Sequence, residues 1–547
     1  MEVNDPRGSI WRKWDLHIHT IESFEHSFSP ADWNIYVEKL KKKAIEHNIE
    51  VIGINDYFTI EGYRYICENF AKKEKDIFYL KENTRRLYLF PVVELRTNNF
   101  LRGKALNIHL IFNPKISSIK IENDFLQKLK FEYKGKKLNL KKEDLLRVGL
   151  SEKENRNIEE IDIEEIIPKE EEEKRKLLRI AYKIISVEKE SLEEALKESI
   201  LKDHIIVVLV GKPKDGLEFS YFEKSGRLAA VLENFVSLHK NVCIFTNKKE
   251  DIEKFIKTYT KPCLWGSDAH RYERLFIPNG DEKSYTWIKA DPTFEGLKQI
   301  IYEPEERVKV QENNPSEDYP KISCIDSIEL ENSKISEDLE FESKFLPLNH
   351  DLIAIIGGRG SGKTALLDII ASCFEDSFKI IRENENSFYK RAFGDSRKEK
   401  SKALKVKLKI KGEDTEFEKT LGSKDDKFKN GFRIEYIPQN YLDEIVANYG
   451  NLTARIKKLL FEKLPSKKEE ENKLKRELED IKGNIKKINN EIVSLKERIK
   501  DKDSLLKEKD SEEGELKRIL DEIGKYRSQD SSIIIDDITS EITKLEE

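Results

Sequence analysis

The feature that most limits how this chain of 547 residues can fold is a heptad pattern close to its C-terminal end. Apolar residues recur there at alternating spacings of four and three, at Leu474, Leu478, Ile481, Ile485, Ile488, Ile492, Leu495 and Ile499. This spacing is typical of a coiled-coil seam. A helix from about 468 to 526 would be roughly 90 Å long at 1.5 Å per residue. We therefore expect it to stand outside any globular domain.

The overall charge argues against binding through a global electrostatic field. Lys and Arg number 100 and Asp and Glu number 105, so the net charge is only -5. Nucleic acid would have to be bound by local patches, such as Lys128 to Lys142 or Lys398 to Lys411, although in so charged a chain a solvated face is the better interpretation of both. The apolar runs are too short to cross a bilayer, and the N-terminal residues lack a secretory pattern. We expect a cytoplasmic protein without a membrane partner.

The order of expected elements divides the chain into several parts. Residues 11 to 112 alternate strand-like runs with helical stretches such as Ala31 to His47, which is typical of a parallel α/β unit. A charged, mostly helical insertion is expected at about 114 to 201. The expected strands of this unit are Trp14 to His19, Val51 to Asn55, Leu87 to Leu95, Leu106 to Phe112, Ile205 to Val210, Val242 to Thr246 and Leu264 to Asp268. We place the domains at 1–308, 322–465 and 466–547, with a linker at 309–321.

Potential metal ligands follow several of these strands. Asp15, His17 and His19 share one face of a strand in DLHIHT, because side chains alternate along a strand. Asp268 and His270 have the same spacing in GSDAH. Single residues of this kind also stand in FPVVEL and NIHLIF, namely Glu94 and His109. Strand ends converge on one mouth of a parallel barrel, so these segments can meet around a metal cluster.

These motifs, in this order, resemble the polymerase and histidinol phosphatase (PHP) family over roughly residues 11 to 308. The resemblance implies a distorted seven-stranded β/α barrel with up to three divalent ions (Mn, Fe or Zn) that promote phosphoester hydrolysis. It implies a first metal on His17, His19, Glu94 and Asp268, and a second on Glu94 and His109. A third would rest on His270, with Asp56 and either His26 or Glu25 as further ligands.

The chain departs from the family pattern at two positions. Asp56 is followed by Tyr57 where the family usually has histidine, and Gly211 and Lys212 stand where a later family histidine is expected. The second and third metals are therefore less secure than the first. These departures favour the alternative that the barrel is a scaffold with impaired catalysis.

The segment GGRGSGKT, Gly357 to Thr364, matches the phosphate-binding P-loop. It lies between an expected strand at Asp351 to Ile356 and a helix that starts near Lys363, as phosphate binding requires. Lys363 would reach the β and γ phosphates of ATP, and Thr364 would ligate Mg²⁺. Further nucleotide contacts are expected from Gly357, Gly358, Gly360, Ser361 and Gly362.

Further strands are expected in this lobe at Ala403 to Lys411 and Phe432 to Ile437. After the second of them stands Gln439, which resembles the Mg²⁺-sensing glutamine of ABC-type and SMC-like ATPases. No convincing second carboxylate strand or signature loop follows. Ile533 to Ile535 with Asp536 and Asp537 are interpreted as a chance match to such a strand. A homodimer or a partner chain would have to complete the ATPase.

The joined motifs, with the segment Asp291 to Val308 between them, resemble the TrlF-type family of PHP-linked, SMC-like ATPases. This resemblance implies an ATP-gated machine that acts on nucleic acid, in DNA repair or in defence against phage. The sequence thus predicts a nuclease-type hydrolase. The two alternatives are an ATP-dependent tethering protein with a scaffold barrel and, less favoured, a small-molecule phosphatase.

Overall fold

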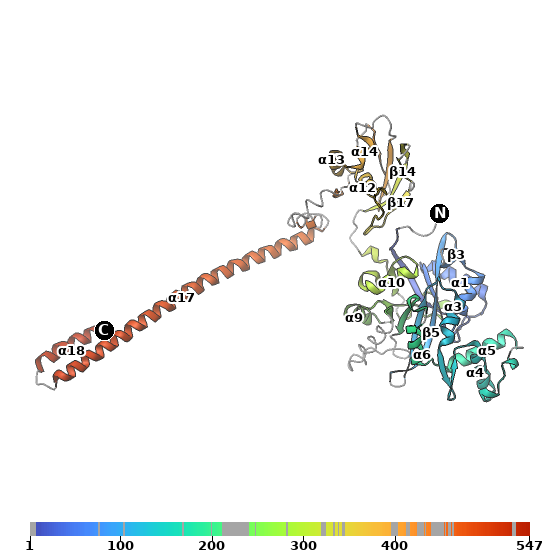
Figure 1. Ribbon diagram of the computed structural model, residues 1–547, viewed down its shortest axis with the longest axis horizontal. Helices are drawn as coiled ribbons and strands as arrows, with labels where there is room; N and C mark the ends of the chain where they lie inside the picture. Colours follow the sequence, from blue (N-terminus) through green and yellow to red (C-terminus); the bar gives the residue numbers. More distant parts are fainter. Residues whose placement is uncertain are drawn as a thin grey trace. The chain divides into compact units, whose positions relative to one another are not determined.

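The computed structural model places the chain in two units, residues 1–434 and 435–547, which are described separately (Figure 1). The residues that the structure describes are 7–74, 77–101, 104–166, 169–198, 200–210, 240–246, 248–280, 283–318, 324–331, 334–336, 339–341, 345–394, 403–411, 416–423, 432, 434–438, 453, 456–457, 461, 464–527 and 532–546.

The N-terminal part of the first unit is built around one 11-stranded sheet. The main path of this sheet runs in the order β11-β10-β9-β6-β5-β2-β1-β12-β13, with β4 on β5 and β3 on β4. The strands are β1 (Trp11–Ile18), β2 (Val51–Tyr57), β3 (Lys72–Glu74), β4 (Ile77–Glu82), β5 (Arg85–Leu101), β6 (Lys104–Phe112), β9 (Ile205–Val210), β10 (Val242–Phe245), β11 (Cys263–Leu264), β12 (Tyr285–Lys289) and β13 (Val308–Gln311).

The sheet is mixed, which corrects the prediction of a parallel α/β unit. Strands β1, β2 and β5 are parallel to one another, as are β9, β10 and β11. By contrast, β6 is antiparallel to both of its neighbours, β5 and β9. The physical reason is the connection: β5 and β6 follow each other too closely for the helical crossover that parallel neighbours need.

The sheet nearly closes on itself through the segment that follows β11. This segment was predicted to be a strand to Asp268, but β11 ends at Leu264. Beyond it, Ala269 forms a parallel bridge to Ile18, and the amide of Asp268 donates to the carbonyl oxygen of His17 at 3.0 Å. The end of β1 is thereby joined to the opposite edge of the sheet, so the residues after β11 lie beside those after β1.

The sheet separates two hydrophobic cores, and helices pack against both. The larger core joins the sheet to α1, α2 and the insertion through residues such as Ile52, Leu89 and Leu110. The smaller one lies on the other face of the strands, around Phe90, and includes Leu297 of α10. The helices of this region are α1 (Trp33–Glu46), α2 (Glu61–Asn69), α9 (Lys249–Tyr259), α10 (Phe294–Tyr302) and α11 (Pro304–Arg307).

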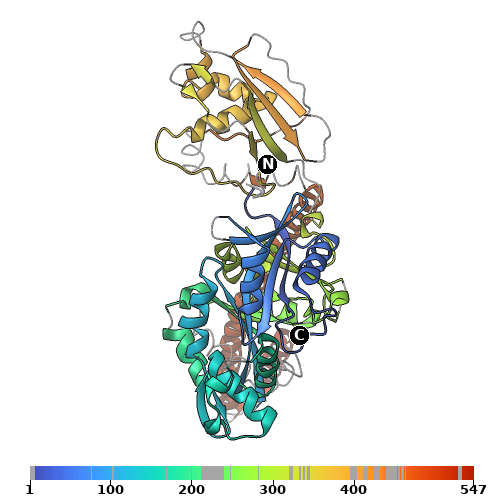
Figure 2. The same ribbon diagram turned by 90° about the vertical axis from the view of Figure 1, so that its right-hand side faces the viewer.

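The insertion between β6 and β9 is mostly helical in its described residues, as predicted, and also contains a hairpin. Strands β7 (Lys130–Tyr133) and β8 (Lys136–Asn139) pair around Lys134 and Gly135, both of which have positive φ. Its helices are α3 (Ser118–Asp124), α4 (Lys142–Glu154), α5 (Glu171–Ile184) and α6 (Lys189–Glu198). In Figure 2 they are drawn in cyan to green and gather beside the blue strands of the sheet.

The second α/β region has a four-stranded sheet in the order β17-β14-β18-β19, which is antiparallel throughout. Strands β15 and β16 form a separate two-stranded sheet and lie between β14 and β17 in the sequence. The described elements of this region are β14 (Ile325–Glu331), β15 (Lys334–Ser336), β16 (Leu339–Glu340), β17 (Phe345–Pro347), α12 (Lys363–Ala371), α13 (Glu375–Glu383), α14 (Phe388–Phe393), β18 (Leu404–Ile410) and β19 (Glu416–Leu421). The strand expected at 403–411 and the helix from Lys363 are confirmed.

Two other strands predicted for this region do not form. Residues 351–356 adopt no strand, and Leu352 and Ile356 are 87% and 89% exposed. The described residues of 432–437 are also outside any strand. A strand needs a neighbour to satisfy its backbone groups, and within the described residues no strand pairs with 351–356. These apolar runs have strand propensity but lack the neighbour that would make them strands.

Two helices of the second unit have described bounds, one long and one short. Helix α17 (Pro465–Arg527) has 63 residues, so the predicted continuous helix is confirmed. The heptad side chains remain 42% to 58% exposed, and pairing into a coiled coil stays a prediction. Helix α18 (Ser532–Glu546) packs back along the end of α17 (Figure 1). Ile533–Ile535 lie in this helix and not in a strand, as expected if their likeness to the second carboxylate strand of an ATPase is due to chance. No helix in the described part of the chain is both long and apolar enough to span a membrane.

Candidate metal centre

The alternation of side chains along β2, β5 and β6 brings three polar residues to one face of the sheet. On β5, Phe90 and Val92 belong to the smaller core, and Glu94 follows on the same face. On β6, His109 lies two residues before Ile111 of that core and is the direct register partner of Glu94. Asn55 on β2 donates from Nδ2 to Glu94 Oε2 at 3.2 Å. The smaller core therefore ends in a polar cluster.

The end of β1 and the segment after β11 complete this cluster. His17 Nε2 lies 3.1 Å from Asp268 Oδ1, 3.3 Å from Glu94 Oε2 and 3.2 Å from His19 Nε2. His19 Nε2 lies 3.5 Å from Asp268 Oδ1, and His109 Nε2 lies 3.4 Å from Glu94 Oε2. The structure thus brings together all the residues expected at the first and second metals.

The donor atoms form two overlapping groups suited to metal ions. One group is His17, His19 and Asp268, and the other is His17, Glu94 and His109. Two ligand atoms of a tetrahedral site with 2.1 Å bonds lie about 3.4 Å apart, which is close to the separations here. Within the described residues, the buried Nε2 of His109 makes no hydrogen bond. A divalent ion would satisfy it, so the residues present fit the metal.

The electrostatics of the cluster favour the protonation states that bind metal. Burial lowers the pKa of His17 to about 3 and also lowers the pKa of His19, so both imidazoles are neutral near pH 7. Burial alone would raise the pKa of Glu94, but the neighbouring His109 and His17 outweigh it and hold that pKa well below its usual range. Neutral imidazoles and an ionised carboxylate are the forms that ligate divalent ions.

The residues expected at a third metal are engaged differently. Both carboxylate oxygens of Asp56 accept hydrogen bonds from Thr20, from its amide at 2.8 Å and its hydroxyl at 2.7 Å. His26 accepts a hydrogen bond at Nε2 from the guanidinium of Arg179 at 2.7 Å. His270 stacks on His19 with ring centroids 4.1 Å apart. Of these three residues, only His270 therefore lies against the group formed by His17, His19 and Asp268.

Glu25 and Tyr57 are the remaining positions singled out around the third metal. Glu25 is exposed. Tyr57 stacks on the other side of His19, with ring centroids 5.0 Å apart. An aromatic ring therefore takes the place where the family pattern expects an imidazole. Gly211 and Lys212 lie outside the described residues, so the second departure from the pattern is not tested.

Several supporting residues were missed by sequence reasoning. Asn107 donates from Nδ2 to Glu94 Oε1 at 2.8 Å, and Asn279 donates to Asp268 Oδ2 at 3.3 Å. Asp15, expected to share a face with the histidines, accepts from the amides of His17 and Ser267. These contacts orient the ligating carboxylates and the two chain segments. Of the two asparagines, only Asn107 carried a signal, because it stands two residues before His109 on the same face of β6.

Asp56 gives a testable pH dependence of stability. Burial raises its pKa from 3.8 to about 7, despite the hydrogen bonds from Thr20. Between these values the folded state holds a proton that the unfolded state has lost, so the free energy of unfolding falls as pH rises from about 4 to about 7. Asp56→Asn should remove up to about 4 kcal/mol of this fall. Urea unfolding in EDTA measures the free energy of unfolding across this pH range. The same dependence of this free energy on pH in wild type and variant would contradict the prediction.

The P-loop residues form an exposed turn before α12. Gly360 and Gly362 have φ of 84° and 85°, a left-handed conformation that favours glycine. The ammonium of Lys363 donates to the carbonyl oxygens of Gly357 and Gly358 at 2.8 and 2.7 Å, so it is folded over the loop. Gln439, the expected second contact to Mg²⁺, lies outside the described residues.

Comparison with known proteins gives one family match and a few distant structural likenesses. The family described as AAA domain matches residues 327–530, which supports an ATPase-type domain there. No curated protein matches the chain.

Three solved structures are similar to parts of the chain. One is endonuclease Q in complex with a 27-mer duplex containing an abasic lesion, at 14% identity and a TM-score of 0.31; the match covers 55% of this chain and 58% of that one. The endonuclease Q of Pyrococcus furiosus, described as lesion-specific, matches with the same identity and coverage and a TM-score of 0.30. A chain from Bifidobacterium adolescentis, described as a metal-dependent phosphoesterase, matches at 12% identity and a TM-score of 0.30, over 53% of this chain and 96% of that one.

These likenesses are too distant to assign an activity. The chain spans only 58% of the length of the endonuclease Q chains that it matches. The PHP-type barrel and membership of the TrlF-type family both stay predictions.

Proposed function

We propose that this protein is a metal-dependent phosphoester hydrolase that acts on nucleic acid and carries an ATP-binding lobe. The observation that carries the proposal is the buried cluster of imidazoles and carboxylates at one end of the nearly closed sheet. His17, His19, Glu94, His109 and Asp268 offer the ligands, and His270 lies against them. When bound, divalent ions there would acidify water and stabilise the charge that develops on a phosphoester.

The residues of the chain contribute orientation and charge around those ions. Asn55 and Asn107 together hold both oxygens of Glu94. Ser23 and the ring Nδ1 of His19 are 3.3 Å apart, a contact that fixes which nitrogen of His19 faces the cluster. His270 stacks on His19 with ring centroids 4.1 Å apart, and its Nε2 lies 3.3 Å from Asp268 Oδ1, so it helps to orient that carboxylate.

The P-loop lobe gives the proposal its second half. A domain that binds ATP next in sequence to a hydrolytic barrel is expected to control access to the barrel rather than to supply its chemistry. The exposed apolar run at 351–356 supports completion of this lobe by a second copy or a partner chain, since an exposed apolar segment with strand propensity gains stability by adding to a sheet.

The competing proposal is a tethering ATPase whose barrel is only a scaffold. It is favoured by Tyr57 and by the engagement of Asp56 and His26 in contacts within the protein. Metal content separates the two proposals, because a scaffold has no need of bound ions.

The test is elemental analysis of protein purified without chelator, alongside hydrolysis of bis(p-nitrophenyl) phosphate and of single-stranded and duplex DNA and RNA. We expect two or more equivalents of Mn, Fe or Zn in the wild type, a clear drop in the His17→Ala/His19→Ala variant, and loss of hydrolysis with the metal. Less than half an equivalent in both proteins, even after reloading with metal, would instead make the barrel a scaffold.

A further inference from the structure

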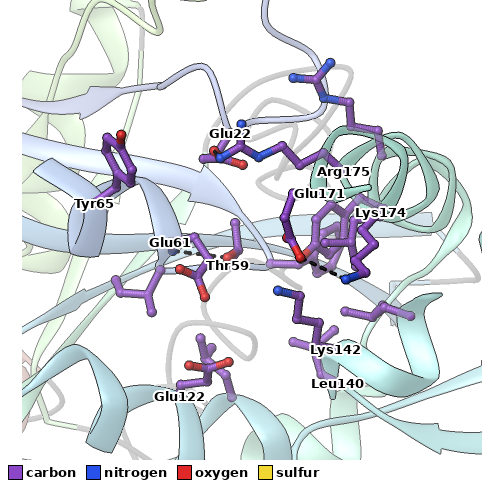
Figure 3. Close-up of a pocket in the computed structure, with 17 residues that line it drawn as sticks. Glu22, Thr59, Glu61, Tyr65, Glu122, Leu140, Lys142, Glu171, Lys174 and Arg175 are labelled. Atoms are coloured by element: carbon purple, nitrogen blue, oxygen red, sulfur yellow. Dashed lines mark hydrogen bonds and ion pairs between the residues drawn. The ribbon is translucent and has the colours of Figure 1, made fainter. Parts of the chain in front are cut away.

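A cavity of about 210 Å³ lies between the barrel and the helical insertion (Figure 3). Its walls include Glu22 from the loop after β1, Phe58 from the end of β2, and residues of α4 and α5. Two of these positions adjoin the candidate metal centre. Glu22 lies three residues after His19, and the amide of Phe58 donates to the carbonyl oxygen of Glu94 at 2.9 Å.

The carboxylates that line the cavity are neutralised by partners in the protein. Arg175 forms an ion pair with Glu22 at 2.9 Å, and Lys174 forms one with Glu171 at 2.9 Å. The remaining two lining carboxylates, Glu61 and Glu122, both contact the guanidinium of Arg64. Three cations therefore contact the four carboxylates, and Glu61 and Glu122 share one of them, Arg64.

Two cations of the lining form no ion pair within the described residues, although both interact electrostatically with Glu22 at longer range. Arg179 donates to the carbonyl oxygen of Ile21 at 3.0 Å and to Nε2 of His26 at 2.7 Å. Both acceptors are uncharged, because a ring nitrogen that accepts a hydrogen bond carries no proton. Lys142 makes no hydrogen bond or ion pair within the described part of the chain, and in Figure 3 its side chain extends into the cavity. An anion bound there would gain two charged donors.

Most of the remaining lining is apolar, which strengthens such an interaction. Phe58 and Tyr182 stack with ring centroids 5.7 Å apart, and leucines of the insertion also line the cavity. Charges beside an apolar surface attract an anion more strongly than charges in bulk water. A nucleotide unit of a nucleic-acid strand combines an anionic phosphate with apolar faces on its sugar and base, so it fits this lining better than a small inorganic anion does.

We propose that this cavity binds a backbone phosphate of the nucleic-acid strand next to the phosphodiester held at the metal centre. The inference rests on the proposed function, since it takes the strand to be the substrate of that centre. Lys142 and Arg179 contact the phosphate, and the apolar floor faces its sugar and base. The insertion therefore contributes directly to substrate binding.

The test measures equilibrium binding of a fluorescent 12-nucleotide oligothymidylate to the full chain in EDTA, by anisotropy over a range of salt concentrations. Lys142→Ala should weaken binding about 3- to 10-fold at low salt and flatten the slope of log K against log salt by about 0.7, the value for one lost phosphate contact on a single strand. Lys142→Arg should keep the wild-type slope. The matched control is Lys153→Ala on the same helix, outside the cavity and paired with Glu173.

The outcomes separate this inference from the proposed function, because binding in EDTA requires no catalysis. Wild-type affinity and slope in Lys142→Ala, or no oligonucleotide binding by the wild type, would overturn the inference even if metal-loaded protein hydrolyses phosphodiesters. Binding that depends on Lys142, without any hydrolysis after metal loading, would keep the cavity and reject the hydrolase. If inorganic phosphate competed as strongly as unlabelled oligonucleotide at equal phosphate concentration, that result would indicate a site for free phosphate and would contradict binding of a nucleic-acid strand.

Discussion

Glu94→Gln is expected to remove bound metal and to lower phosphodiester hydrolysis by more than about 100-fold, the upper range seen when only a supporting contact of a metal ligand is lost. Glu94 Oε2 lies 3.3 Å from His17 Nε2 and 3.4 Å from His109 Nε2, so one oxygen faces both expected metals. The amide keeps the shape of the carboxylate but removes its charge. Elemental analysis and bis(p-nitrophenyl) phosphate hydrolysis measure the two effects.

The matched control for this variant is Glu82→Gln on the neighbouring strand β4. Glu82 forms a surface ion pair with Lys41, so its loss should leave metal content and hydrolysis unchanged. Full metal content in Glu94→Gln would contradict the assignment of Glu94 as a ligand. A loss of metal in both variants would instead indicate general destabilisation of the sheet.

Lys363→Ala is expected to weaken binding of MgATP about 10- to 100-fold, since a hydrogen bond to a charged group contributes about 1.5 to 3 kcal/mol. In the structure the Lys363 ammonium lies over the loop and donates to two carbonyl oxygens of that loop. The β and γ phosphates of ATP would replace those oxygens as acceptors. Titration with a fluorescent ATP analogue measures the change, and Lys379→Ala, which removes a surface pair with Glu375, is the control.

ATP turnover by this chain alone is expected to be slow, although ATP binds. The described lobe offers a P-loop and a helix, but the apolar run before that loop forms no strand and is exposed. A complete site needs a second carboxylate and a positioned water, which neither this run nor the P-loop supplies. Efficient turnover by the purified chain that disappears in Lys363→Ala would reject this expectation.

The sequence alone predicted the elements whose signals are local. The heptad pattern predicted one long helix at about 468–526, and α17 spans Pro465–Arg527. Alternation and strand-like composition predicted β2, β5, β6 and β9 to within a few residues at most of their ends. Motif spacing also selected Glu94, His109 and Asp268, because chemistry-bearing residues at strand ends are recognisable without coordinates.

Only the tertiary structure decided which strands pair and what surrounds the ligands. The run at 351–356 has the composition of a buried strand yet remains exposed, since strand formation depends on a neighbour that a local pattern does not show. Asp56 and His26 matched the family pattern, but Thr20 and Arg179 engage them instead. Arg179 comes from an insertion that the sequence predicted as charged and mostly helical, without indicating what it contacts. Contacts between residues far apart in the chain depend on packing, and packing is a property of the whole fold.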